Sequence, residues 1–174
     1  MAGRQRMRPP GEPRSGWREV RQRFWAAIRR KGYTLISMSE AEERHAHNIK
    51  VIEEFRASAG QAGGSGPTLL LTTTGAKTGR ERTVPVMYMA DGNRLLIFGS
   101  RAGSDKHPDW YHNLRKQPVV TVEVGREKYQ ARATPVEGEE HDRLYATHAA
   151  AYPIFAEYQS RTKRVIPVIA LTKL

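Results

Sequence analysis

Residues 69–101 constrain the fold more than any other part of the sequence, because they contain three consecutive strand patterns. Residues 69–74 are apolar and β-branched, residues 83–89 alternate apart from Pro85, and residues 95–98 are apolar again. The second connection, residues 91–93, contains a glycine that can adopt the positive φ angle of a hairpin turn. Links of this length predict strands that are antiparallel neighbours.

The first connection between these strands is unusually basic. Gly75 and Gly79 flank Lys77, and Arg80 and Arg82 follow before the next strand. Glycines let backbone N–H groups approach an anion closely, and the cations neutralise its charge. A nucleotide P-loop is excluded. In that motif the second glycine precedes the lysine and a helix follows directly, whereas here Gly79 comes after Lys77 and a strand pattern follows. Two interpretations stay open: a phosphate-binding turn, or a surface hairpin that happens to be basic.

The composition excludes several classes of protein. The 174 residues contain no cysteine, which excludes disulfides, thiolate zinc sites and a cysteine nucleophile. No apolar run reaches the length of about 18 residues that a membrane span needs. The basic N-terminus lacks the apolar core of a secretory signal. We therefore expect a cytoplasmic chain with one substantial folded domain.

Most of the positive charge lies at the N-terminus. Of the net charge of +11, residues 1–31 supply +8, from ten Lys or Arg against two Glu. Residues 1–15 are rich in Arg, Pro and Gly and are expected to be disordered, whereas residues 17–30 have the spacing of a basic amphipathic helix. That helix could lie on an anionic membrane surface or pack its aromatic stripe on the folded body. We divide the chain into a basic arm, residues 1–37, and a folded domain, residues 38–174, and expect no specific nucleic-acid partner.

The rest of the sequence predicts further strands and helices. An apolar stripe at Ala46, Ile49, Ile52 and Phe55 predicts a helix before the first strand. The remaining predicted elements are a helix between Pro108 and Pro118, a hairpin of residues 119–124 and 128–136, helices over residues 139–151 and 154–160, and a strand over residues 165–171. This order predicts a small antiparallel barrel, because closure removes exposed strand edges. A sheet with helices on one side is the alternative.

The six histidines do not predict a metal site. His45 and His47 are two positions apart and point in different directions on a helix, and His141 and His148 are two helical turns apart.

Three segments together resemble the deazaflavin-dependent nitroreductase family, whose members are often described as quinone reductases. The segments are LLLTTTGAKTGRERTVPVMYM, GSRAGSDKHPDWYHNL and AAYPIFAEYQSRTKRVIPV, and the resemblance spans residues 48–171. It implies an α+β, mainly β fold: a split β-barrel of the FMN-binding type with flanking helices. It also implies coenzyme F420 as cofactor.

The resemblance places the F420 phosphate among Lys77, Arg82 and Arg101. A groove with further cations suits the phosphodiester and polyglutamate tail of F420. The predicted cofactor-binding residues are Lys77, Thr78, Arg80, Arg82, Pro85, Ser100, Arg101, Lys106, Trp110 and Asn113. For one of Trp110 and Tyr111, we expect plain core packing instead.

The resemblance also implies hydride transfer from reduced deazaflavin to a quinone, enone or nitro-type acceptor. The predicted catalytic hydroxyls are those of Tyr152, Tyr158 and Ser100, which would stabilise negative charge on the acceptor. Simple packing of the two tyrosines against the core is the alternative. Phe155 stands where the family often has a third tyrosine, which puts nitroimidazole reduction in doubt.

Other functions are kept open. The barrel could use FMN in place of F420, or bind either cofactor without catalysis. It could also be a basic module that binds a membrane or nucleic acid through residues 1–31. We expect a small-molecule electron acceptor as partner. A homodimer, by resemblance, and peripheral membrane contact through the arm stay open.

Overall fold

The predicted three-stranded segment forms antiparallel neighbours in the computed structural model, which describes residues 39–61 and 66–174. Strand β1 (Thr68–Thr74) pairs with β2 (Glu81–Asp91), and β2 pairs with β3 (Arg94–Phe98). The predicted arm over residues 1–37, with its amphipathic helix, lies outside the described residues.

The sheet closes into a barrel. Three further strands, β4 (Val119–Val124), β5 (Glu127–Val136) and β6 (Val168–Lys173), complete the order β1-β2-β3-β6-β5-β4. Because β1 pairs with β4 and β3 pairs with β6, the sheet has no free edge. The predicted antiparallel barrel is confirmed, and the alternative of an open sheet with helices on one side is wrong.

Two strands differ from the sequence prediction by more than one residue at each end. Strand β2 extends two residues beyond each end of the predicted segment, and Pro85 sits within it opposite Leu70. The last strand begins at Val168 rather than at residue 165. Val165 is 66% exposed, and Pro167 has no N–H group to donate to a neighbouring strand.

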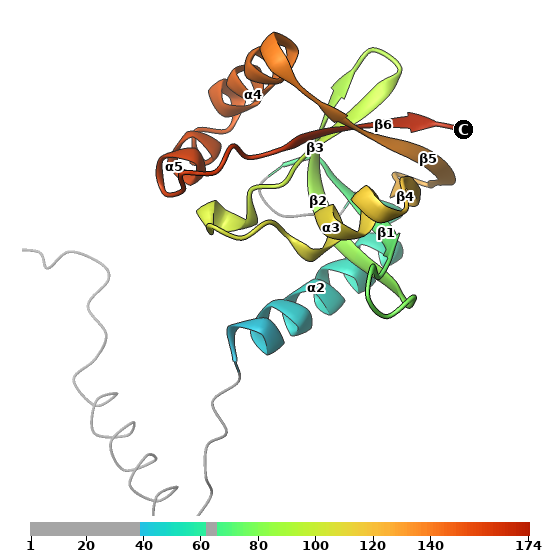
Figure 1. The fold of residues 1–174 in the computed structure, drawn as a ribbon. Coiled ribbons are helices and arrows are strands. Elements are labelled where there is room, and N and C mark those ends of the chain that lie inside the picture. Colours follow the sequence, from blue (N-terminus) through green and yellow to red (C-terminus); the bar gives the residue numbers. More distant parts are fainter. Residues whose placement is uncertain (1–38, 62–65) are drawn as a thin grey trace, which may run out of the picture. The chain divides into compact units, whose positions relative to one another are not determined.

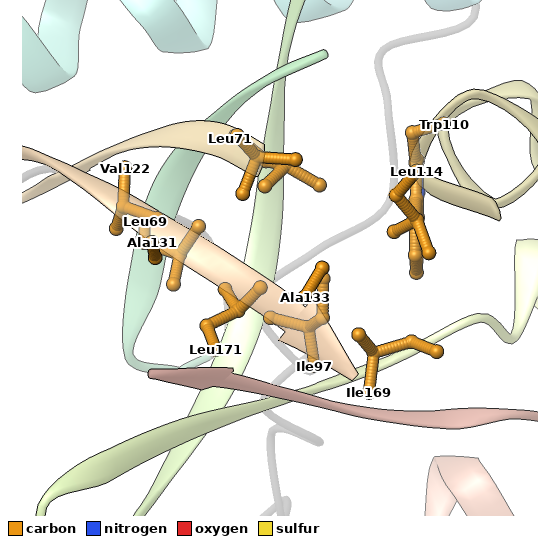
Figure 2. Close-up of a cluster of buried hydrophobic side chains, with 11 residues drawn as sticks. Leu69, Leu71, Ile97, Trp110, Leu114, Val122, Ala131, Ala133, Ile169 and Leu171 are labelled. Atoms are coloured by element: carbon orange, nitrogen blue, oxygen red, sulfur yellow. The ribbon is translucent and has the colours of Figure 1, made fainter. Parts of the chain in front are cut away.

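The inside of the barrel is an apolar core. Its buried members are Leu69, Leu71, Ile97, Trp110, Leu114, Val120, Val122, Ala131, Ala133, Ile169 and Leu171. Trp110 and Leu114 project from helix α3 (Asp109–Lys116) towards the strand side chains, as Figure 2 shows. Helix α3 therefore contributes two large side chains to the core that the strands enclose.

A second core lies outside the barrel wall. Alternate residues of β3, Leu96 and Phe98, face away from the interior and pack with helices α4 (Gly138–Ala151) and α5 (Ile154–Ser160). The two helices lie together on one side of the barrel in Figure 1. Strand β3 is therefore covered on both faces, which explains its continuous apolar run in the sequence.

Helix α2 (Glu40–Ala57) packs against a different part of the barrel, where it contacts β2. Phe55 is 1% exposed, and Arg56 Nη2 lies 2.7 Å from Glu123 Oε1 on β4. Ile49, however, is 44% exposed although it belongs to the predicted apolar stripe. Of the predicted stripe only Phe55 is buried and Ile52 is half-buried, so the stripe packs against the barrel only near the C-terminal end of α2. No helix in the described part of the chain is long and apolar enough to cross a membrane.

Candidate functional site

A cavity of about 690 Å³ opens between α2, β2 and α3. Helix α2 contributes Arg44, His45 and Asn48 to its lining, and strand β2 contributes five consecutive residues from Glu81 to Pro85. Consecutive strand residues point to alternate faces, so the start of β2 must meet the cavity with its backbone as well as its side chains.

The opposite wall comes from the 99–108 loop after β3 and from α3. Arg101, Pro108, Asp109, Trp110 and Asn113 complete this wall, together with Thr73 at the end of β1. A proline directly before α3 and an aspartate in its first turn suit the start of a helix. The sequence therefore fixes where α3 begins, and the barrel places that beginning at the cavity.

Charged side chains of both signs line the cavity. Three are cations, Arg44, Arg82 and Arg101, and two are carboxylates, Glu81 and Asp109. Arg101 Nη1 donates to the carbonyl of His107 at 2.8 Å and lies 3.7 Å from Asp109 Oδ1. The Asp109 side chain is 95% exposed, so water screens this ion pair strongly. The lining is therefore cationic on balance.

The basic turn between β1 and β2 is held in place by α3. Asn113 Oδ1 accepts from the backbone N–H of Ala76 at 2.9 Å, and its Nδ2 donates to Thr73 Oγ1 at 3.0 Å. Lys116 Nζ also donates to the carbonyl of Ala76 at 2.7 Å. Asn113 is 8% exposed. It thus lines the cavity and at the same time fixes the turn on the helix.

The turn's backbone is largely bonded within the protein. The N–H of Gly75 donates to Arg80 and the N–H of Gly79 donates to Gly75, each at 2.8 Å. Gly79 has a φ angle of +67°, which explains the glycine there. The sequence interpretation in which glycine N–H groups hold an anion is therefore revised: an anion at this turn would meet side chains.

The predicted cofactor-binding residues fall into two groups. Those that line the cavity are Arg82, Pro85, Arg101, Trp110 and Asn113. Those that are not among the described lining residues are Lys77, Thr78, Arg80, Ser100 and Lys106. Of the second group, all but Ser100 are exposed on the surface. The roles of both groups stay predictions.

Trp110 combines the two interpretations that the sequence offered for it. It is 8% exposed and belongs to the barrel core, yet it also lines the cavity. Tyr111 packs more loosely against the same core, and its ring stacks on His107 with centroids 4.5 Å apart.

The predicted catalytic tyrosines lie in the layer between the barrel and helices α4 and α5. Tyr152 is half-buried with its ring centroid 5.1 Å from that of His148, and the Tyr158 ring lies 5.5 Å from that of Phe155. Neither tyrosine is among the described residues that line the cavity. Their catalytic role, and that of Ser100, stays a prediction.

Several lining residues escaped the sequence interpretation, above all Arg44, His45 and Asn48 on α2. The sequence did contain a signal, since polar residues lie between the apolar positions of that helix. It did not show which part of the barrel the polar face would meet.

No cluster of three or more potential metal-ligating side chains exists among residues 39–61 and 66–174.

A sequence model described as F420H(2)-dependent quinone reductase matches residues 44–173, most of the chain. The chain belongs to this family. An F420H(2)-dependent quinone reductase of Mycobacterium tuberculosis is 40% identical over 131 residues, which cover 68% of this chain and 85% of that protein. The resemblance drawn from the sequence motifs is thereby confirmed.

Solved structures agree with this assignment to the F420H(2)-dependent quinone reductase family. A structure titled F420-H2 dependent reductase (FDR-A) is 40% identical, has a TM-score of 0.56, and covers 60% of this chain and 93% of its own. A second, titled domain-swapped dimer, is 34% identical with a TM-score of 0.58 and covers 76% of this chain and 99% of its own. The predicted mainly β split barrel is confirmed.

Proposed function

We propose that this chain transfers a hydride from reduced F420 to a quinone, with the cofactor held in the cavity between α2, β2 and α3. The observation that carries the proposal is a cationic cavity at the barrel surface, bordered by the motifs that place the chain in its family. The names of the relatives favour F420 over FMN.

The residues of the cavity fit the chemistry of F420. The cofactor has an anionic phosphodiester and polyglutamate tail, for which Arg44, Arg82 and Arg101 supply charge and N–H donors. Pro85 and Trp110 supply apolar surface for a flat ring. A volume of about 690 Å³ is in the range of cofactor sites.

Reduced deazaflavin supplies a hydride when bound, and the protein must handle the charge that this leaves on the acceptor. A quinone that gains a hydride also needs one proton to become a hydroquinone. We propose that the hydroxyls of Tyr152, Tyr158 and Ser100 donate hydrogen bonds to the quinone oxygens as negative charge develops there. Phe155 has no hydroxyl to add, which favours quinone over nitro acceptors.

Tyr145 lies in the same layer but does not suit this role. Its hydroxyl already donates to the carbonyl of Phe155 at 2.8 Å. Burial raises the pKa of Tyr145 to about 12, which makes it a poor proton donor. Among the tyrosines of this layer, the half-buried Tyr152 and Tyr158 therefore suit the proposed role better than Tyr145.

The proposal is tested with purified protein, reduced F420 and menadione, by following the absorbance of oxidised deazaflavin. Arg82→Met and Arg101→Met should each raise the KM for reduced F420 about tenfold or more, because each loses a charge-assisted hydrogen bond to an anion. Arg126→Met, in the exposed turn after β4, is the matched control. Absence of F420 binding at micromolar concentration would overturn the proposal, as would purification of a yellow, FMN-bound protein.

We also propose a homodimer, supported by the relative whose title names a domain-swapped dimer. Light scattering of the full chain should then give twice the monomer mass of 19.7 kDa. Cytoplasmic location and membrane contact through the basic arm are proposals from the sequence. Sedimentation with anionic vesicles, compared between the full chain and a variant lacking residues 1–37, tests the second.

A further inference from the structure

The 99–108 loop, which carries Arg101 to the cavity, has a strained backbone. Three successive residues, Arg101, Ala102 and Gly103, have positive φ angles of 45°, 52° and 79°. Only the third is a glycine, and side chains with a Cβ rarely adopt this conformation. Contacts elsewhere must therefore hold the loop in this shape.

The side chain of Arg164 supplies these contacts from a distant part of the sequence. Its Nη2 donates to the carbonyls of Gly99 at 3.0 Å and Ser100 at 2.8 Å, and its Nε donates to the carbonyl of Ser104 at 2.8 Å. These carbonyls lie on both sides of the strained residues. One planar guanidinium thus bridges the start and the end of the strained turn.

His107 completes the set of partners. Arg164 Nη1 lies 3.3 Å from His107 Nδ1. Burial, and then the charge of Arg164, lowers the pKa of His107, so its ring is neutral near pH 7 and Nδ1 can accept from the guanidinium. The carbonyl of the same residue accepts from Arg101 Nη1 at 2.8 Å. His107 therefore connects Arg164 directly to the cavity cation.

The segment that contains Arg164 is tied to the loop at a second point. Thr162 is 7% exposed, and its Oγ1 donates to Asp105 Oδ1 at 2.7 Å. A Cβ at Gly103 would lie 3.0 Å from the carbonyl oxygen of Tyr158, so the loop also presses closely on α5. Within residues 39–61 and 66–174, Arg164 forms no direct ion pair with a carboxylate; its partners are carbonyls and a neutral imidazole.

We propose that Arg164 is a positioning residue for cofactor binding: it holds the 99–108 loop in the conformation that presents Arg101 to the anionic part of reduced F420. This inference rests on the proposed function of the cavity. A lysine could not replace it, because an ammonium group offers its donors from one point and cannot bridge carbonyls at both ends of the loop.

The test compares Arg164→Lys and Arg164→Met with Lys163→Met. Lys163 is exposed and next in the sequence, so its variant removes one positive charge from the same segment. We expect both Arg164 variants to weaken F420 binding, measured by the cofactor's fluorescence, by about tenfold or more, because a misplaced binding group loses most of its contribution. The KM for reduced F420 should rise similarly, and kcat with menadione should fall as well, because the same loop carries Ser100, whose hydroxyl we propose faces the quinone. Lys163→Met should match the unmodified chain.

A second measurement needs no cofactor. Backbone amides of residues 99–107 should exchange with deuterium at least about tenfold faster in the Arg164 variants than in Lys163→Met, because loss of the bridge lets the loop open locally. Unchanged F420 affinity in either folded Arg164 variant would overturn the inference, and so would unchanged amide exchange. If the unmodified chain binds no F420 while exchange still accelerates, the proposed function fails and only the loop-holding role stands.

Discussion

The two cores of this protein differ in chemistry although they share the strands β3 and β6. The core inside the barrel is almost wholly aliphatic, with Trp110 as the single large aromatic among its buried residues. The outer core, between the barrel wall and helices α4 and α5, contains Phe98, Tyr145 and Phe155 around the imidazole of His148. In β3 and β6, therefore, one face of the strand contributes apolar packing alone, while the other face packs against groups able to titrate or donate hydrogen bonds.

His148 shows the contrast most clearly. It is fully buried, and in the part of the chain that the structure describes neither ring nitrogen has a hydrogen-bond partner. Its ring stacks on Phe98 with centroids 3.8 Å apart. A buried polar group without partners is unfavourable. The outer core is therefore the less optimised of the two for stability, next to the tyrosines that we propose face the acceptor.

The largest effect is expected in the inner core. Leu71→Ala should lower the free energy of unfolding by about 2–5 kcal/mol, because Leu71 is 0% exposed and the barrel wall cannot collapse into the space left behind. Urea denaturation followed by circular dichroism measures this change. Val165→Ala, at a position that is 66% exposed, is the control and should change stability little. If Leu71→Ala lowered the free energy of unfolding no more than Val165→Ala does, the inner core would not be the main source of stability.

The second effect, on pH dependence, belongs to the outer core. Burial lowers the pKa of His148 to about 4 from 6.5. Between these values the unfolded chain binds a proton at this residue and the folded chain does not, so stability falls as pH is lowered. The loss from His148 should reach about 3 kcal/mol by pH 4 and change little further below it.

Denaturation of His148→Leu and of the unmodified chain at pH 7 and pH 5 isolates the pH dependence that His148 causes, because both chains have the same carboxylates. The variant should gain stability relative to the unmodified chain on going from pH 7 to pH 5. His47→Leu, at an exposed position on α2, is the matched control. An equal difference between His148→Leu and the unmodified chain at both pH values would contradict the lowered pKa.

Tyr145→Phe should cost less, about 1 kcal/mol. The change removes the hydrogen bond from the Tyr145 hydroxyl to the carbonyl of Phe155 and leaves that carbonyl without this donor, while the ring keeps its packing on Phe98. Thermal unfolding at pH 7 measures the loss. A loss as large as that from Leu71→Ala would mean that the outer core depends on this bond more than on its apolar contacts.

The smallest effect is expected at the rim of the outer core. Arg94 lies between Asp91 in its own hairpin and Glu140 on α4, with side chains that are partly exposed. Arg94→Met should cost about 0.5 kcal/mol, and the difference should shrink in 1 M salt, because exposed ion pairs are weak and screened. Salt-independent destabilisation would instead indicate that the aliphatic part of Arg94 is what packs against α4.

Much of the fold followed from the sequence by local rules. Local patterns predicted the hairpin turns, the helix after Pro108 and the strands over residues 69–98, because each of these depends on neighbours within a few residues. Their order along the chain then predicted the closed antiparallel barrel. The basic turn and the PDWYHNL motif likewise indicated the family, and so the cofactor.

The tertiary structure alone decided which of the predicted residues meet. It brought Arg44 on α2 to the same cavity as Arg101, and it showed Lys77 and Arg80 to be surface residues outside that lining. It also placed Arg164 on the loop of Arg101, although 63 positions separate them by their numbers in the sequence. Local patterns determine which elements form, but contacts between elements depend on how the barrel closes, and no residue carries that information by itself.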